Sequence, residues 1–389
     1  MTKRNNLLIF ILTLGVFAII NTEMGVVGIL PLIAGNFHVS VPKAGLLVSL
    51  FALGVAIAGP TMPLLFSGIN RRTVMLLVLG IFFVGNIVSA FSTSFTVVLI
   101  ARVIPAFFQP IYCSLAFTAA STSVSKEEAP KAVAKVIMGV SAGMVLGVPV
   151  ASFIASATSL KMAMLFFAVM NGLAFIATII FIPSMPVNER LSYGAQLSVL
   201  KKPITWISIV TVIFINGAIF GVYSYFAEYL KSVTNIPETT ISLVLLIYGL
   251  ANMIGNIIAG RLLTKNAIKF IVSFNFVLGA VYIIMFLMGR FTLPMVLITL
   301  AWGILAGAGA NINQYWIMSA APEAPEFANG LFLTAANLGT TFGTSVCGLF
   351  ISGIGTQYIV LGGLLFLILS LVSILIRNHV HNSNKELSR

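Results

Sequence analysis

The chain has 389 residues, of which 59% are hydrophobic and only 8% are charged, and its mean hydropathy is +1.10. A soluble globular chain carries about 25% charged residues. This composition therefore excludes a water-soluble enzyme, a nucleic-acid binder, a disordered chain and a secreted disulfide scaffold. The two cysteines, Cys113 and Cys347, lie inside apolar runs, and the chain contains no aspartate. What remains is a polytopic membrane protein.

The apolar runs predict the number of spanning helices, since each span requires roughly 20 mostly apolar residues. The runs are continuous and much longer than the roughly 10 alternating residues of a barrel strand. The N-terminus lacks a small-residue cleavage site, so the first run is predicted to be a helix that is retained. We predict an all-α membrane protein with twelve transmembrane helices, at 7–33, 44–66, 74–93, 95–120, 133–157, 162–182, 204–226, 239–262, 270–289, 292–318, 329–353 and 358–377.

The distribution of Lys and Arg predicts the orientation of these helices. If the N-terminus is cytoplasmic, sixteen basic residues lie in inside segments and four in outside segments, and Arg102 lies within a span. Basic residues favour the cytoplasmic side, so both termini are predicted to be cytoplasmic. The net charge of +12 then faces the anionic inner leaflet rather than a nucleic acid.

A weak internal repeat divides the chain near its middle. Pro42 and Pro237 are 195 residues apart, and so are Gly54 and Gly249. We therefore predict two parallel six-helix halves, at 1–182 and at 204–389 with a short basic tail, joined by a cytoplasmic linker at 183–203. This layout, with a substrate site between the halves near the midplane, is typical of one class of secondary transporters. Each half supplies its own packing partner, so we expect a monomer.

Four stretches carry a resemblance to a known family: NTEMGVVGILPLIA at 21–34, GPTMPLLFSGINRR at 59–72, GVSAGMVLGVPVASFI at 139–154 and ANGLFLTAANLGTTFGTSVCGLFI at 328–351. The chain resembles the drug:proton antiporter branch of the major facilitator superfamily, which includes bacterial multidrug, sugar and purine efflux proteins. The stretch at 59–72 lacks the acidic residue usual in the family's loop motif. The resemblance implies efflux of a small molecule by alternating access across the bacterial cytoplasmic membrane, driven by a proton gradient without a cofactor.

Two ionisable residues inside predicted spans are the candidates for proton coupling. Because charge within a bilayer is costly, Glu23 and Arg102 are functional candidates by default. Counted along their helices, the two lie at similar depth, and in the resembled fold both helices line the central cavity. Burial disfavours the charged carboxylate, whereas a nearby guanidinium favours it, so hydration and substrate can decide the protonation of Glu23. The alternative is a fixed ion pair that positions two helices, with Arg102 bracing its own helix.

Polar and aromatic side chains on the first, fourth, seventh and tenth predicted helices form a second candidate group. Amides and aromatic rings can orient and stack an uncharged or weakly cationic planar ligand. The alternative is hydrogen bonding between helices. The predicted substrate-binding residues are Asn21, Gln109, Tyr112, Asn216, Tyr223, Tyr225, Asn311 and Gln314.

Small residues, one proline and an arginine pair are predicted to serve packing and gating. Glycines spaced by four let two helix backbones approach closely, and a proline permits a bend. The arginine pair after the second helix is interpreted either as an inner-gate latch or as an orientation signal. These residues are Gly139, Gly143, Gly147, Pro149, Arg71 and Arg72, and Gly339 and Gly343 are the expected counterparts of the glycines.

Other classes of function find little support in the sequence. No phosphate-binding loop is present, so the chain has no ATPase of its own. The three histidines lie at helix ends or in the tail, so no metal site is predicted. An intramembrane enzyme would need paired acids or a histidine at one depth. Glu228, near the outer end of the seventh helix, is interpreted as an interfacial anchor or outer-gate residue, or as a second proton site. Uptake by symport, and narrow efflux of a sugar or purine, stay open.

Overall fold

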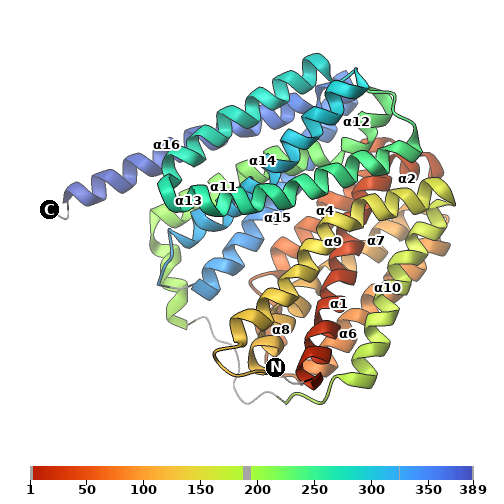
Figure 1. The fold of residues 1–389 in the computed structure, drawn as a ribbon, viewed down its shortest axis with the longest axis vertical. Helices are drawn as coiled ribbons and strands as arrows, with labels where there is room; N and C mark the ends of the chain where they lie inside the picture. Colours follow the sequence, from red (N-terminus) through yellow and green to blue (C-terminus); the bar gives the residue numbers. More distant parts are fainter. Residues whose placement is uncertain (1–2, 187–193, 324, 388–389) are drawn as a thin grey trace. The chain divides into compact units, whose positions relative to one another are not determined.

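The computed structural model describes residues 3–186, 194–323 and 325–387, and within these ranges it contains helices, turns and loops but no strand (Figure 1). The centre of the predicted linker, 187–193, and the last two residues of the basic tail lie outside the described residues. The chain divides into two compact units, Met1–Val39 with Ile57–Ser192 and Ser40–Ala56 with Tyr193–Arg389.

The first unit holds the helices that carry the predicted proton site. They are α1 (Lys3–Gly25), η1 (Val26–Ile29), α2 (Leu30–Asn36), α5 (Met62–Leu65), α6 (Arg71–Phe91), α7 (Phe95–Ala106), α8 (Gln109–Thr122), α9 (Ala129–Ala157) and α10 (Leu160–Phe181).

The second unit begins with a short segment from the first half of the sequence. Its elements are α3 (Val41–Ala44), α4 (Leu46–Ala58), η2 (Gly194–Lys201), α11 (Pro203–Ser224), α12 (Phe226–Ser232), α13 (Glu238–Met288), α14 (Thr292–Met318), α15 (Pro325–Ile354), η3 (Thr356–Tyr358) and α16 (Ile359–Leu387). Two hydrogen bonds hold the early segment to α15: Thr341 Oγ1 donates to Ser49 O at 3.1 Å, and Thr334 Oγ1 donates to Ala56 O at 3.2 Å. The predicted division at 183–203 stays a prediction.

Ten helices among the described residues are long and apolar enough to cross a membrane. The 51-residue α13 covers two predicted spans, 239–262 and 270–289, and non-helical torsions at Asn266 interrupt it between them. The Asn266 side chain accepts a hydrogen bond from Lys269 N at 3.1 Å, as an N-cap residue does. The predicted all-α fold is thus confirmed for the described residues, whereas the number twelve and the side on which the termini lie stay predictions.

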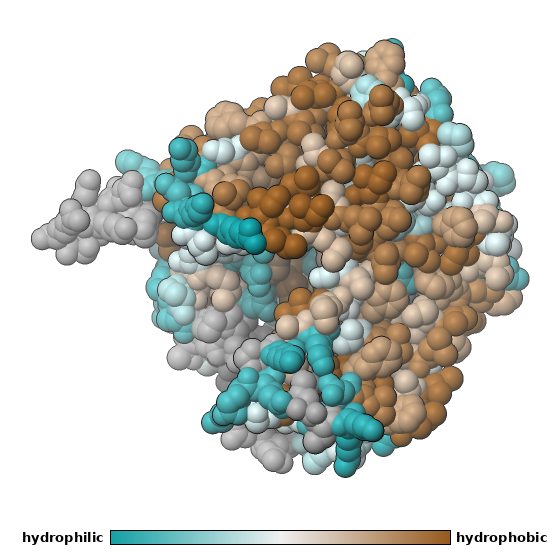
Figure 2. Space-filling model, in the orientation of Figure 1, coloured by the Kyte–Doolittle hydropathy of each residue, from teal (hydrophilic) through white to brown (hydrophobic). Residues whose placement is uncertain are grey.

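The long helices expose large apolar side chains along their flanks. On the face drawn in Figure 2, hydrophobic residues cover much of these flanks, and hydrophilic residues gather toward helix ends. Phe10, Ile257 and Leu293 are 63%, 64% and 72% exposed. Apolar patches of this extent mark a membrane contact rather than a water-facing surface.

In each unit, glycines on one long helix allow it to pack closely against another, α9 against α1 in the first unit and α15 against α11 in the second. A Cβ added at Gly139 would lie 2.5 Å from Thr13 O of α1, and one at Gly143 would lie 2.8 Å from Ile20 Cβ. In the second unit, a Cβ at Gly339 would lie 2.6 Å from Ile213 O of α11. Only glycine allows these helix pairs, α1 with α9 and α11 with α15, to approach so closely.

Candidate functional site

The carboxylate of Glu23 lies in the first unit between α1, α7 and α8. Gln109 Nε2, at the start of α8, donates to Glu23 Oε2 at 2.6 Å. Arg102 of α7 is 2% exposed and interacts electrostatically with Glu23. Cys113, one turn beyond Gln109, interacts with the same carboxylate. The structure thus brings together the two residues predicted to couple protons and adds Gln109 as the direct partner of the acid.

A break in the fourth predicted span places Arg102 and Gln109 at this carboxylate. Pro105 lies inside α7 and Pro110 lies in the first turn of α8, and neither can donate a helical hydrogen bond. The chain turns between them, where Phe108 N bonds to Pro105 O at 2.9 Å. Arg102 therefore lies near the end of α7, and Gln109 begins α8.

Thr22, the neighbour of Glu23, is the meeting point of four helices. Its backbone oxygen accepts from Arg102 Nη2 at 2.7 Å. Its hydroxyl accepts from Asn171 Nδ2 of α10 at 2.8 Å and from Asn86 Nδ2 of α6 at 3.2 Å. All these side chains are nearly fully buried, so they fix α1 at the residue before the acid. Asn86 and Asn171 were not among the predicted site residues, although each is an amide inside an apolar run, which was the available signal.

Two other predicted residues of the first unit are buried near this network. Asn21 is 0% exposed and packs against α9, where a Cβ at Gly147 would lie 3.0 Å from its Oδ1. Neither polar atom of the Asn21 amide has a hydrogen-bond partner among the described residues. Tyr112 is also fully buried and packs on Gly15 of α1. Both residues serve the packing of α1 in this structure.

The predicted amides of the second unit bond between helices. Asn216 Nδ2 of α11 donates to Ala336 O at 2.6 Å and to Thr340 Oγ1 at 3.0 Å, both on α15. Asn311 Nδ2 of α14 donates to Asn256 Oδ1 of α13 at 2.8 Å. Gln314 is exposed. These contacts match the alternative interpretation, hydrogen bonding between helices.

An aromatic cluster surrounds Tyr223 of α11. Its ring stacks on Tyr248 of α13, with 4.4 Å between centroids, and meets the edge of Trp302 of α14 at 6.1 Å. Phe226 packs on Trp302 at 4.9 Å. Tyr225, by contrast, lies over Gly45 and Gly348, so it supports the contact between α15 and the early segment.

The residues predicted for gating are held within the first unit. Arg71 Nη1 donates to Thr122 Oγ1 at 3.4 Å at the end of α8, and Arg72 Nη2 donates to Ile179 O at 2.6 Å near the end of α10. Pro149 lies inside α9. Beside it, a Cβ at Gly28 of η1 would lie 2.7 Å from Val148 O, so close packing continues along α9.

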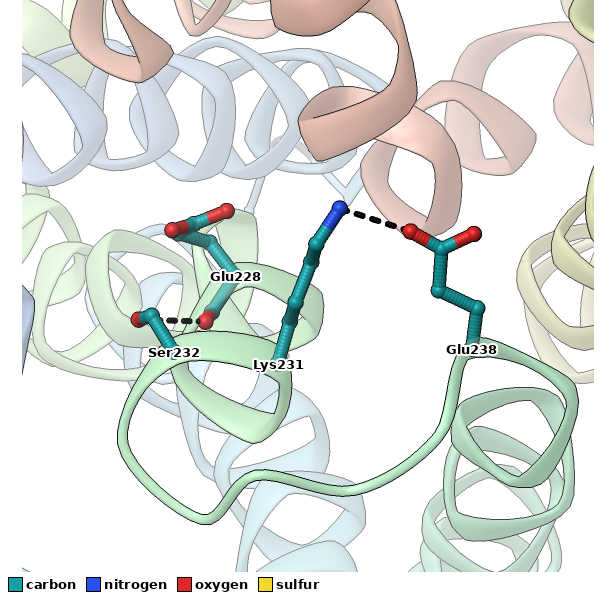
Figure 3. Close-up of polar contacts among 4 residues, drawn as sticks. All are labelled: Glu228, Lys231, Ser232 and Glu238. Atoms are coloured by element: carbon teal, nitrogen blue, oxygen red, sulfur yellow. Dashed lines mark hydrogen bonds and ion pairs between the residues drawn. The ribbon is translucent and has the colours of Figure 1, made fainter.

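Glu228 lies in α12, outside the helices long enough to span. Figure 3 shows Lys231 reaching Glu238 at 2.6 Å, whereas Ser232 Oγ donates to the backbone oxygen of Glu228 at 2.8 Å. Burial raises the pKa of the Glu228 carboxyl, and the charge of Lys231 opposes that shift. No group of three or more His, Cys, Asp or Glu side chains in the described parts of the chain could hold a metal ion.

Comparison with known proteins identifies the family. The Major Facilitator Superfamily model matches residues 12–324 and, in a second match, 209–389. The chain is 27% identical over 349 residues to the inner membrane transport protein YdhP of Escherichia coli K12, with 90% of each chain covered. It is 30% identical over 369 residues to YtbD, an uncharacterized MFS-type transporter of Bacillus subtilis 168, with 93% of each covered. A probable sugar efflux transporter of Helicobacter pylori G27 is 25% identical over 354 residues, with 90% of each covered.

Solved structures share the fold at low sequence identity. A bacterial homologue of the human lysosomal transporter Spinster, inward-facing and unoccupied, has a TM-score of 0.78 at 14% identity, covering 97% of this chain and 98% of that one. The nucleoside transporter NupG has a TM-score of 0.77 at 15% identity, covering 97% and 99%. The family match and the relatives confirm the predicted family, the predicted membrane location and the prediction that the chain is a transporter rather than an enzyme. This chain is a multi-pass integral membrane protein that belongs to the major facilitator superfamily of transporters.

Proposed function

We propose that this protein is a proton-coupled exporter of small organic compounds in the bacterial cytoplasmic membrane, working as an antiporter by alternating access. In this proposal the chain acts as a monomer of twelve spanning helices, arranged in two parallel six-helix halves with both termini cytoplasmic. The proton gradient is its only energy source, and no cofactor takes part. The observation that carries the proposal is the Glu23 carboxylate, held by Gln109 beside the buried charge of Arg102.

The chemistry of this carboxylate suits antiport. An isolated charge in a dry site is costly, and an arginine nearby offsets that cost. Small changes in the hydration or polarity around Glu23 therefore decide whether the proton is bound. A substrate that displaces water, or that competes for Arg102, favours one protonation state. Proton and substrate can thus favour alternating occupancy, which antiport requires.

The test is efflux in everted membrane vesicles with a panel of ethidium, a labelled sugar and a labelled nucleoside. Wild-type transport of at least one compound should collapse when an uncoupler is added. Glu23→Gln should abolish driven transport while binding of that compound persists. Glu127→Gln is the matched control, because Glu127 is an exposed loop carboxylate. Driven transport by Glu23→Gln at the wild-type rate would overturn the proposal.

Narrow efflux of a sugar or a nucleoside is the second candidate. It is supported by the relative named as a probable sugar efflux transporter and by the structural neighbour that is a nucleoside transporter. In the vesicle assay, uncoupler-sensitive movement of a single sugar or nucleoside, with no movement of ethidium, would favour this candidate over a drug exporter. Proton-driven uptake would instead appear as movement in the opposite direction under the same gradient.

A further inference from the structure

The Gln109 side-chain amide donates a hydrogen bond to Glu23 through its nitrogen and has a second polar atom, its oxygen, that can accept one. Its Nε2 donates to Glu23 Oε2 at 2.6 Å. Its Oε1 is buried and has no partner among the described residues, although a buried carbonyl normally accepts a hydrogen bond. The NH₂ group of the Gln109 amide is therefore hydrogen-bonded, whereas its oxygen has no hydrogen-bond partner among the described residues.

The two protonation states of a carboxyl need opposite partners. A carboxylate accepts hydrogen bonds only, whereas the protonated acid presents one O–H that must donate. An amide can serve both, because turning it by 180° exchanges its NH₂ group with its oxygen. The charged or titratable groups that face Glu23 in the described structure are Arg102 of α7 and Cys113 of α8. A guanidinium only donates and a thiol is a weak partner, so neither replaces the amide.

The backbone of α1 is held in place beside Glu23. A change of hydrogen bonding at Glu23 is therefore accommodated by its partner, the Gln109 side chain. Thr22 is bonded to Arg102, Asn171 and Asn86 from three different helices. These contacts hold the α1 backbone one residue before the acid. A turn of one side-chain amide is a small motion in comparison with a shift of that helix.

We propose that Gln109 is the hydrogen-bond partner of Glu23 in both protonation states, and that its amide reverses when the proton binds or leaves. This inference rests on the proposed function, in which Glu23 carries the proton. The only covalent bond that forms or breaks is the O–H bond of the Glu23 carboxyl, with the proton exchanged with water. Gln109 is then a positioning residue for the proton site rather than a ligand of the substrate.

The test is infrared difference spectroscopy of the purified full-length protein in lipid vesicles, comparing acidic with alkaline buffer. Bands of Glu23 are those that Glu23→Gln abolishes. In Gln109→Leu, both the carboxylate band and the protonated C=O band of Glu23 should shift, the latter to higher frequency. Gln109→Met preserves the side-chain length and should give the same result if the leucine variant does not fold. Gln357→Leu is the control, because Gln357 bonds to Arg290 at 3.0 Å in the second unit.

A shift of the carboxylate band alone, or of neither band, would overturn the proposed role of Gln109 while leaving Glu23 as the proton site. If no band disappears in Glu23→Gln, the carboxyl does not titrate and the proposed function itself fails. Transport provides a second readout. We expect Gln109→Leu to lower kcat for proton-driven efflux roughly 10- to 100-fold, the range for the loss of one hydrogen bond to a charged group, with KM unchanged. A raised KM with kcat unchanged would instead make Gln109 a substrate ligand.

Discussion

Asn171 ties α10 to α1 through hydrogen bonds whose strength can be measured. Its Nδ2 donates to Thr22 Oγ1 at 2.8 Å and to Ala18 O at 3.3 Å, both on α1. Hydrogen bonds between membrane helices average about 0.6 kcal/mol, with a maximum of about 1.7 kcal/mol. The shorter bond should therefore couple Asn171 to Thr22 by about 0.6–1 kcal/mol.

The assay is a double-mutant cycle on reversible unfolding of the purified protein in mixed micelles with increasing SDS. The four proteins are wild type, Thr22→Val, Asn171→Leu and the double variant. We expect the double variant to lose about 0.6–1 kcal/mol less stability than the sum of the single losses. Asn171→Leu combined with Ser352→Ala should be additive, because Ser352 Oγ donates to Gly348 O within α15, in the other unit. A coupling of zero between Thr22 and Asn171 would refute the network described around Glu23.

Two further predictions concern packing and a surface ion pair. Gly339→Ala should destabilise the protein by roughly 1–3 kcal/mol, because its Cβ would meet α11, whereas Gly353→Ala, with open space around it, should be neutral or slightly stabilising in the same SDS titration. The hydrogen bond from Lys202 lowers the pKa of the exposed Glu323 carboxyl, so this pair stabilises the protein above the ordinary carboxyl pKa, and its contribution is lost as pH falls through the lowered pKa. Glu323→Gln should lower the free energy of unfolding by less than about 1 kcal/mol at neutral pH. The same substitution should make that free energy depend less on pH in the acidic range. An equal loss of stability at acidic and neutral pH would contradict this.

Much of the helical architecture could be predicted because it depends on composition and on local breaks. The apolar runs predict helices, and the polar break at Thr264–Asn266 coincides with the non-helical torsions that divide α13. Counting residues along two helices places Glu23 and Arg102 at similar depth, and the family resemblance implies that both helices line one cavity. These features need only the helical rise and the cost of burying charge.

The remaining contacts depend on helix rotation, which a uniformly apolar run does not reveal. Asn86 and Asn171 converge on Thr22 only because α6 and α10 turn those faces toward α1. Gln109 was predicted to bind substrate, since an amide seven residues after Arg102 gives no sign of which neighbour it meets. The break between Pro105 and Pro110 determines that Gln109 contacts Glu23, and the geometry of the break depends on tertiary packing.

The central claim is that Glu23 exchanges a proton against the transported compound. The most direct measurement uses purified protein in proteoliposomes that contain a trapped pH-sensitive dye, with the compound that moves in the vesicle panel added outside. In wild type, entry of the compound should drive protons out of the liposomes, and the internal pH should rise. In Glu23→Gln we expect exchange of labelled compound to continue with no change in internal pH. Proton movement in Glu23→Gln equal to that of wild type would contradict the account.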